Sequence, residues 1–490
     1  MTAMPLKDRA IKGAIWAAFG GNGAQVLAFV IFIAISRMVG PAAFGVVAVC
    51  LLIVELTRAI TSECVAVNLV SQARFDKRAF DAGFILAAGA SLVVTLALIA
   101  AAPLAAMLFR SPEVAAALPL LAPLLVVHAL SRLLESELTL RMAFRALAMR
   151  SIGAVMLGGA VGVGAAYAGW GVTALILQQW VSAGAAMILL FLQARWRPGF
   201  NVGWAHLRTL AAQSAAIAPA NLVSNFRQAV DGFAVASFSG VAAAGLYNLA
   251  KRTRLAFQLG LTSAIGRVAL PAFGQLKGDP KRLANAAERA MQLAAILAFP
   301  VFVGTGAIAP ELIQLVLGPV WLEAAAPMAL LMIGGAIATT TGLYENLLLI
   351  LGRRGRIVGL HVFVLALLGV LILLVGRNGP VAIAAAVLFV GAVHNFGAWN
   401  LAAQRLPLRI GAYIRNIGAP LIMSVAMFAL IAFVRDTDMA HALPLVLRLA
   451  LLVAIGAVFY IAASWLFART AVDATLDAAR TVLKKVPNGA

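Results

Sequence analysis

Charged side chains within apolar segments are the residues of this sequence whose types and spacing are suited to chemistry. Glu55 and Arg58 stand three residues apart in one apolar stretch, and Arg227 and Asp231 stand four apart in another. Either spacing places both charges on one face of a helix. A charge at the centre of a membrane-spanning helix costs about 2.5–3.5 kcal/mol, so it needs a partner or a hydrated cavity. Each pair therefore either neutralises itself or lines such a cavity.

A third charged group lies in the stretch GLYNLAKRTRLAFQLG at residues 245–260, which carries three cations and no acid. At 1.5 Å per residue the cations lie roughly 15–20 Å from the preceding turn, near the middle of a hydrocarbon layer about 30 Å thick. A positive patch in a hydrated cavity suits an anionic ligand, and arginine suits phosphate in particular. The predicted substrate-binding residues are therefore Arg58, Arg227, Lys251, Arg252 and Arg254.

Acidic residues and histidines within spans are candidates for ion coupling. We assign that role to Glu55, Asp231 and Glu345, while His394 more simply forms a hydrogen bond with a neighbour. Glu135 and Glu137, which lie beside Arg132 and Arg141 near the end of another span, are expected to form surface ion pairs. The sequence holds no P-loop, H-E-x-x-H or paired C-x-x-C motif, and it predicts no cofactor and no metal site.

The elements that position these residues are membrane-spanning helices. Of the 490 residues, 63% are hydrophobic and 11% are charged, against about 45–50% and about 25% in soluble domains. Apolar runs predict about fourteen spans of about 20 residues each. The expected fold is thus all-α and polytopic, because backbone groups in lipid must be satisfied within each segment. The loops are too short for the extramembrane catalytic domain of an enzyme.

The basic residues indicate how the spans are oriented. The formal net charge is +20, and most lysines and arginines fall in alternate loops, which the positive-inside rule places in the cytoplasm. An even number of spans, with both termini cytoplasmic, fits this alternation. Topology thus accounts for the basic excess, and nucleic-acid binding is not expected. The tail at 469–490 is amphipathic and either lies on the membrane surface or is a solvated helix.

An internal repeat suggests how the spans are grouped. Gly40-Pro41-Ala42-Ala43-Phe44-Gly45 aligns with Gly240-Val241-Ala242-Ala243-Ala244-Gly245 at an offset of 200 residues. The predicted organisation is two pseudo-repeated six-helix lobes at 1–200 and 201–405, two additional transmembrane helices at 406–468, and the tail at 469–490. Two repeats with parallel orientation place the substrate site between them.

Four segments carry a resemblance to a known family: ISRMVGPAAFGVVAV at 35–49, VDGFAVASFSGVAAAGLYNLAKR at 230–252, GRVALPAFGQLKGDPKRL at 266–283 and LVLGPVWLEAAAPMALLM at 315–332. The sequence resembles the Wzx-like oligosaccharide flippases of the polysaccharide transporter family. That family lies within the MOP superfamily, which also includes MATE exporters and MurJ-type flippases. The likeness covers most of residues 5–405.

The resemblance implies a flippase of the bacterial inner membrane that carries undecaprenyl-pyrophosphate-linked oligosaccharide to the periplasmic leaflet by alternating access. It also implies that cationic cavity residues hold the pyrophosphate, and that a polysaccharide polymerase and export machinery are partners. A MATE-like small-molecule exporter is the main rival, although its cationic substrates would be repelled by a positive cavity. A membrane enzyme and a scaffold for assembly proteins are further candidates.

Overall fold

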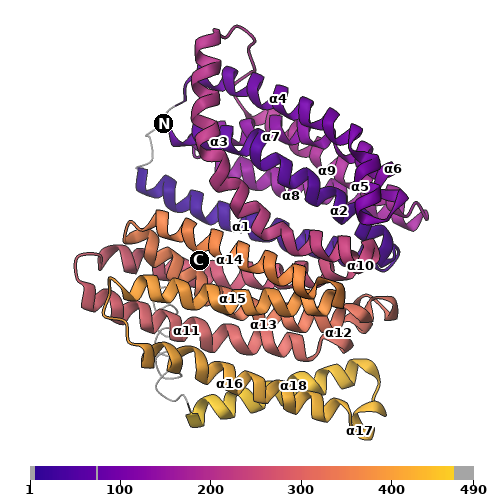
Figure 1. Ribbon diagram of the computed structural model, residues 1–490, viewed down its shortest axis with the longest axis vertical. Helices are drawn as coiled ribbons and strands as arrows, with labels where there is room; N and C mark the ends of the chain where they lie inside the picture. Colours follow the sequence, from indigo (N-terminus) through magenta and orange to yellow (C-terminus); the bar gives the residue numbers. More distant parts are fainter. Residues whose placement is uncertain (1–5, 73–74, 468–490) are drawn as a thin grey trace, which may run out of the picture. The chain divides into compact units, whose positions relative to one another are not determined.

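The computed structural model describes residues 6–72 and 75–467, and every regular element in these ranges is a helix. The all-α fold expected from composition is therefore confirmed for the described chain (Figure 1). The predicted cytoplasmic tail at 469–490 lies outside the described residues. The same holds for the extreme N-terminus, so the predicted orientation of the two termini stays a prediction.

The described helices are long and apolar enough to cross a membrane many times. Twelve helical stretches meet that condition, and a shorter apolar stretch, Gly20–Ser36, belongs to the first helix. One of the twelve, Asn221–Leu261, contains a break at Gly240, where φ is +86°. When its two arms are counted separately and the first helix is included, the described chain has about fourteen spans, as the sequence predicted.

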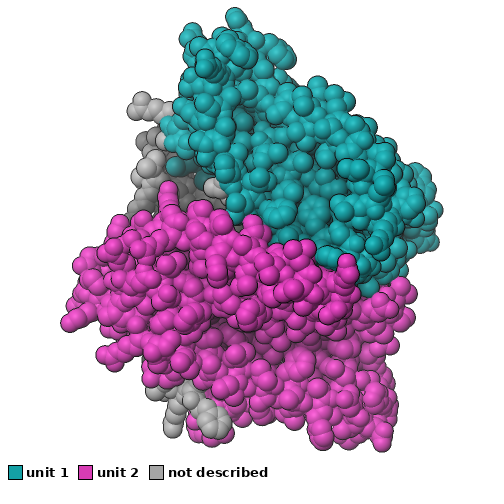
Figure 2. Space-filling model, in the orientation of Figure 1, with its two compact units in different colours: residues 1–248 teal, residues 249–490 magenta. Residues whose placement is uncertain are grey.

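The chain divides into two compact units, residues 1–248 and 249–490 (Figure 2). This division reflects packing, whereas the boundary predicted at residue 200 concerns an internal duplication. The predicted lobes at 1–200 and 201–405 therefore stay a prediction. Each unit has its own buried apolar clusters, and each is described by itself below.

Ten α-helices and one π-helical turn begin in the first unit, and the last helix continues into the second. They are α1 (Leu6–Ser36), α2 (Pro41–Arg58), the π-helical turn η1 (Ala59–Glu63), α3 (Cys64–Ser71), α4 (Lys77–Ala100), α5 (Ala102–Phe109), α6 (Pro112–Leu121), α7 (Leu124–Leu140), α8 (Phe144–Tyr167), α9 (Val172–Gln193) and α10 (Trp204–Gln275).

Proline and aspartate residues set where several of these helices begin. Pro41 stands at the start of α2, where its missing N–H costs nothing because the first helical N–H groups have no partner within the helix. Asp76 caps α4 by accepting a hydrogen bond from the backbone N–H of Arg78. Gly240 has a left-handed φ that an L side chain rarely adopts, and this allows α10 to bend there.

Small residues let helices of the first unit approach closely. A Cβ placed on Gly158 would lie 2.6 Å from Ser182 Cβ, and one on Gly162 would lie 2.8 Å from Gln178 Cβ. A four-residue spacing of glycines is typical of close helix packing, and α8 packs against α9. This packing brings polar side chains of both helices toward the same space.

A buried aspartate fixes the segment that leads to α10. Asp81 on α4 is 5% exposed and forms an ion pair of 2.6 Å with Lys77. Its Oδ1 accepts hydrogen bonds from Trp196 Nε1 and from the backbone N–H of Gly199, each at 2.9 Å. Further along, Asn68 on α3 donates to the side chains of Gln213 and Ser214 on α10. These contacts hold the first arm of α10 against α3.

The second unit contains the remaining elements, which follow the second arm of α10. They are α11 (Pro280–Ala307), α12 (Ala309–Val316), η2 (Pro319–Ala324), α13 (Ala325–Ile350), α14 (Arg354–Val375), η3 (Gly376–Asn378), α15 (Pro380–Ala403), α16 (Ile410–Arg435), α17 (Asp438–His441) and α18 (Leu445–Phe467).

The helices α16 and α18 pack on each other and on α11 (Figure 1). They fall within 406–468, whose separation from the second lobe stays a prediction. A buried carboxylate reinforces this packing. Glu311 on α12 is 2% exposed, and its Oε1 lies 3.0 Å from Arg435 Nε and 3.1 Å from Arg448 Nη2. One acid of the short helix α12 thus joins the end of α16 to the start of α18.

Candidate functional site

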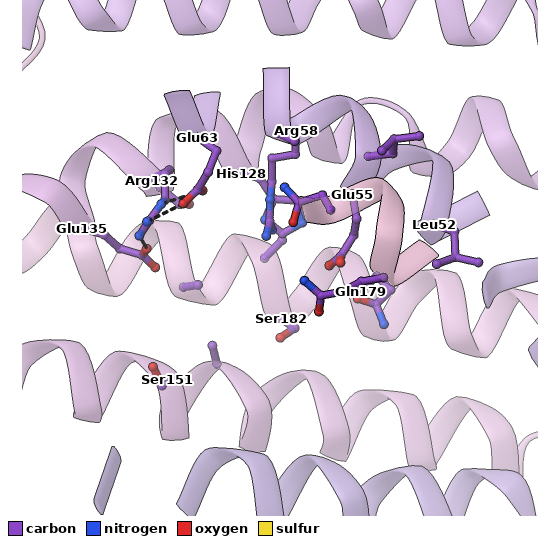
Figure 3. A pocket seen from close by; sticks show the side chains of 18 of the residues that line it. Leu52, Glu55, Arg58, Glu63, His128, Arg132, Glu135, Ser151, Gln179 and Ser182 are labelled. Carbon is purple, nitrogen blue, oxygen red and sulfur yellow. Dashed lines mark hydrogen bonds and ion pairs between the residues drawn. The ribbon is translucent and has the colours of Figure 1, made fainter. Parts of the chain in front are cut away.

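A polar cavity of about 730 Å³ lies within the first unit. Its walls come from α1, α2, η1, α7, α8, α9 and the first arm of α10 (Figure 3). This volume falls within the range of about 300–1,000 Å³ that is common for ligand pockets. Three arginines, three glutamates and a histidine reach it, namely Arg58, Arg132, Arg150, Glu55, Glu63, Glu135 and His128.

The π-helical turn η1 places the charged residues at the end of α2 and in η1 itself on the cavity wall. Arg58 ends α2, and Glu63 ends η1 five residues later. In a continuous α-helix, five residues would turn the chain about 140° past one full turn, so the two side chains would diverge. A π-turn closes its hydrogen bonds between residues five apart and brings such positions onto one side. The interruption therefore directs both Arg58 and Glu63 toward the cavity, where Figure 3 shows them.

Two of the arginines are held by the acids in a continuous ion-pair network. Arg132 on α7 donates from Nε and Nη2 to the two oxygens of Glu63, at 2.9 and 2.7 Å. It also donates from Nη1 to Glu135, one turn further along α7, at 3.0 Å. Glu135 accepts in addition from Arg150 on α8. The network joins η1, α7 and α8 along one side of the cavity.

Arg58 stands outside this network. Among the side chains that the structure describes, neither Arg58 nor Glu55 takes part in an ion pair, although both line the cavity. Arg58 lies beside His128 on α7, while the carboxylate of Glu55 is directed toward Gln179 on α9 (Figure 3). Arg150 is also close enough to His128 to act on it electrostatically. The cavity is thus balanced in formal charge, but it has a cationic region around Arg58.

Uncharged polar groups form another wall. On α10, four amide and hydroxyl side chains recur at helical spacing and share one face, namely Asn221, Ser224, Asn225 and Gln228. Gln179 and Ser182 on α9 and Ser151 on α8 add to this lining. Amides and hydroxyls both donate and accept hydrogen bonds, which suits a ligand rich in hydroxyl groups.

The structure distributes the predicted site residues over both units. Arg58 and Glu55 line the cavity of the first unit. Arg227 and Asp231 belong to the same unit, on the first arm of α10, but they do not line this cavity. Asp231 is 5% exposed and accepts a hydrogen bond of 3.1 Å from the hydroxyl of Tyr247. A binding role for Arg227 and a coupling role for Glu55 and Asp231 stay predictions.

The cations predicted to bind substrate in the stretch 245–260 lie in the second unit, on the second arm of α10. Lys251 and Arg254 are half-buried, and Arg252 is exposed. The stem of Arg254 lies against α13, where a Cβ on Gly335 would come within 2.9 Å of Arg254 Cγ. Within the described part of the chain, Arg254 has no acidic partner. Substrate binding by these three residues stays a prediction.

The third ion-coupling candidate, Glu345, also lies in the second unit. It contacts His361 Nε2 at 2.7 Å and His394 Nε2 at 3.0 Å. The sequence analysis expected His394 to bond a neighbouring residue. It did not anticipate that His361, which is 33 residues away in sequence and on another helix, would contact the same glutamate.

Sequence reasoning missed most of the ion-pair network. It expected Glu135 and Glu137 in ion pairs at the surface. The pairs are present, since Arg132 binds Glu135 and Arg141 binds Glu137, but the surface location is wrong. Glu137 is 2% exposed and Glu135 lines the cavity. The spacing of His128, Arg132 and Glu135, at i, i+4 and i+7, is the signal that could have placed them on one face.

Comparison with known proteins places this arrangement in a family. The family described as "Polysaccharide biosynthesis protein" matches residues 34–326, more than half of the chain and all of the helices that line the cavity except α1, of which it covers only the last three residues. The chain belongs to this family. The predicted membership in the polysaccharide transporter family is thereby confirmed.

Two curated relatives show how far this family likeness extends. The succinoglycan biosynthesis transport protein ExoT of Rhizobium meliloti (strain 1021) is 26% identical over 477 residues, which cover 95% of this chain and 94% of ExoT. The lipopolysaccharide biosynthesis protein WzxC of Escherichia coli (strain K12) is 22% identical over 353 residues, which cover 71% and 72% of the two chains. This polysaccharide biosynthesis protein is therefore similar to ExoT over nearly its whole length.

A solved structure has the same fold. The lipid II flippase MurJ, in an inward closed conformation, superposes with a TM-score of 0.74 at 13% identity, covering 94% of this chain and 100% of the other. At that identity the likeness shows the fold alone, which is the one expected for the MOP superfamily. The polysaccharide biosynthesis protein described here thus combines a MurJ-like helical fold with many helices that are long and apolar enough to cross a membrane.

Proposed function

We propose that this protein is a flippase that carries undecaprenyl-pyrophosphate-linked oligosaccharide from the cytoplasmic to the periplasmic leaflet of the bacterial inner membrane. The transported oligosaccharide would be used for lipopolysaccharide or exopolysaccharide export. The protein would open first to the cytoplasmic and then to the periplasmic leaflet, by alternating access. The names of ExoT and WzxC, which refer to succinoglycan transport and lipopolysaccharide biosynthesis, support this class of cargo.

The observation that carries the proposal is the cavity around Arg58. A pyrophosphate is anionic and bears many hydrogen-bond acceptors, so an arginine without an acidic partner suits it. Arg58 has that property among the described side chains, and it lies next to His128. The amide and hydroxyl face of α10 offers both donors and acceptors to a sugar. One cavity thus combines groups for the two parts of the headgroup.

The physical task of such a protein is to shelter the headgroup alone. A charged pyrophosphate and its sugars cannot enter hydrocarbon without a large desolvation cost, whereas the polyprenyl tail is soluble in it. A hydrated polar cavity replaces lost water with fixed dipoles and charges, and this lowers the barrier for the headgroup. The tail can remain in lipid throughout the movement.

The paired arginines support this task in a different way. Because Glu63 and Glu135 already satisfy Arg132 and Arg150, these charges hold the cavity walls and leave Arg58 as the cation with the least competition. A cavity lined only by unpaired cations would be costly in the membrane and would bind pyrophosphate too tightly to release it. We infer that the balanced charge permits both binding and release.

We also propose that the protein acts as a transporter and not as an enzyme, with both termini in the cytoplasm and with a polymerase and export proteins as partners. A MATE-like exporter of cationic small molecules is less well supported, because Arg58 would repel a cation from its side of the cavity. We also propose that transport is coupled to movement of an ion at Glu55, Asp231 or Glu345.

Deletion of the gene in its host tests the proposal. We expect loss of a surface polysaccharide together with accumulation of its lipid-linked oligosaccharide, measured by mass spectrometry of extracted lipids. A plasmid copy of the wild-type gene should restore both. If the deletion leaves lipid-linked precursors unchanged but raises sensitivity to cationic drugs, the protein is a small-molecule exporter and the proposal fails.

A further inference from the structure

Three potential metal ligands from three different helices meet in the second unit. They are Glu345 on α13, His361 on α14 and His394 on α15, and one ligand atom of each lies within 4.8 Å of the others. α15 packs against both α13 and α14, which brings the three side chains together. This group has no sequence motif, because each of the three helices contributes only one of its residues.

Both histidines present the same ring atom to the same carboxylate oxygen. His361 Nε2 lies 2.7 Å and His394 Nε2 lies 3.0 Å from Glu345 Oε1. The two rings meet nearly edge to face, with an interplanar angle of 76° and centroids 5.3 Å apart. This arrangement gathers two nitrogens and one oxygen from three helices within 4.8 Å of one another.

The hydrogen bonding of His394 indicates that the group is not only structural. His394 is 7% exposed, yet its Nε2 makes no hydrogen bond in the described structure, despite lying 3.0 Å from Glu345 Oε1. A buried polar atom left without a hydrogen bond is unfavourable, and one histidine would suffice to bond the carboxylate. Two ligands of one metal ion likewise lie close together without a hydrogen bond between them, because both direct their lone pairs at the ion.

From this geometry, we propose that Glu345, His361 and His394 bind a transition-metal dication of the Zn²⁺ type. Imidazole and carboxylate together favour such ions, whereas Ca²⁺ and Mg²⁺ prefer oxygen ligands alone. Two histidines and one glutamate make three protein ligands of a tetrahedral site, with the fourth position open to water. Metal–ligand bonds of about 2.0–2.2 Å place tetrahedral ligand atoms about 3.3 Å apart. The Glu345 oxygen, now 2.7 and 3.0 Å from the two histidine nitrogens, needs to separate from each by only a few tenths of an ångström.

The site is placed to link helices while remaining reachable. The side chains of Glu345 and His361 are 26% and 17% exposed, so an ion can enter without opening the whole bundle. Once bound, it would tie α13, α14 and α15 together and offset the negative charge of Glu345. The site lies wholly in the second unit and involves none of the residues that line the Arg58 cavity. The site shares only Glu345 with the proposed ion-coupling residues, and zinc binding can be tested without any transport measurement.

The test uses the full chain purified in detergent, stripped with a chelator and then incubated with Zn²⁺ or, separately, Mg²⁺. After desalting, elemental analysis should find about one zinc per wild-type chain and no retained magnesium. Zinc should also raise the thermal unfolding midpoint by about 5 °C, because an ion that binds only the folded state stabilises it. The variants His361→Gln and His394→Gln should lose the zinc and the shift. His206→Gln is the matched control, because His206 is exposed and lies in the first unit, and it should retain both.

A second measurement avoids dependence on the stability of the variants. Co²⁺ bound to the wild-type chain should give the intense visible absorption of a tetrahedral nitrogen and oxygen site, and Zn²⁺ should displace it. The inference is overturned if the wild-type chain retains no zinc. It is equally overturned if both histidine variants bind as much zinc as the His206→Gln control. It is also overturned if zinc leaves the thermal unfolding midpoint of the wild-type chain unchanged, so that these histidines affect unfolding only through pH.

Discussion

Arg132 on α7 and Glu63 at the end of η1 form a two-pronged ion pair, with Nε–Oε2 and Nη2–Oε1 distances of 2.9 and 2.7 Å. Bidentate geometry fixes the relative orientation of the two groups as well as their distance. The pair therefore connects a π-helical turn, whose backbone geometry is unusual, to a regular helix. We regard this connection as the feature that shapes the cavity wall next to Arg58.

Replacing Glu63 with Gln should weaken that wall modestly. The side chains of Arg132 and Glu63 are 36% and 26% exposed, so solvent screens the pair and we expect a loss of ~1 kcal/mol in the free energy of unfolding. A double-mutant cycle with Arg132→Gln, measured by unfolding in detergent, isolates the coupling. Glu55→Gln serves as the control. The interpretation is wrong if Arg132→Gln costs as much in the Glu63→Gln background as in the wild type.

The cations of the second unit give a second prediction. Replacing Lys251, Arg252 and Arg254 together with Gln should reduce export at least about tenfold, because each charge-assisted hydrogen bond to a phosphate is worth about 1.5–3 kcal/mol. Export can be measured as surface polysaccharide in a complemented deletion strain, with membrane insertion checked by immunoblotting. The matched control replaces three exposed cations around the turn between α10 and α11 with Gln, namely Lys277, Lys281 and Arg282. Normal export by a well-inserted variant at 251, 252 and 254 would remove these residues from the binding site.

The two aligned glycine-containing segments of the internal repeat give a third prediction. Gly45 and Gly245, which occupy the same place in the repeat, pack directly together: a Cβ on Gly45 would lie 1.7 Å from the carbonyl oxygen of Val241, and one on Gly245 would lie 2.0 Å from that of Pro41. Gly45→Ala should therefore cost about 1–3 kcal/mol through overpacking. Gly40→Ala is the control, because Gly40 has an ordinary φ of −65° and open space around its Cβ position. Equal unfolding midpoints for the two variants would contradict the close contact.

A fourth prediction concerns the C-terminal helices. Glu311→Gln removes the one acid shared by Arg435 and Arg448 and leaves two partly buried cations without it. Breaking a buried ion pair from one side typically costs about 3–5 kcal/mol. We expect a marked drop in the unfolding midpoint, and none in Glu323→Gln, where the acid is exposed. Proteolysis that releases fragments containing α16 and α18 would locate the weakened region, and an unchanged midpoint would show that the network contributes nothing.

The spans themselves could be predicted from the sequence because each depends on a local run of apolar residues. The pair of Glu55 and Arg58 could also be recognised, since a charge in such a run is conspicuous. The neighbouring ion-pair network could not be predicted from the sequence. Its members Glu63, Arg132 and Arg150 come from elements that meet only through folding. The π-turn at Ala59–Glu63 has no sequence signal that we can identify, yet it determines which way Glu63 points. The helical spacing of the polar residues from Asn221 to Gln228 could have predicted the polar face of α10. The charge of Arg227 instead made that residue the predicted binding residue.

The central claim is that Arg58 receives the pyrophosphate of a lipid-linked saccharide, and a reconstituted assay tests it most directly. Purified protein in liposomes would be given a fluorescent polyprenyl-pyrophosphate N-acetylglucosamine, with movement between leaflets followed by quenching of the exposed label. Arg58→Gln should slow the movement about ten- to a hundredfold, Arg58→Lys should retain part of it, and Arg78→Gln, an exposed site outside the cavity, should behave as the wild type. Wild-type rates from Arg58→Gln, in protein shown to be folded and inserted, would contradict the account.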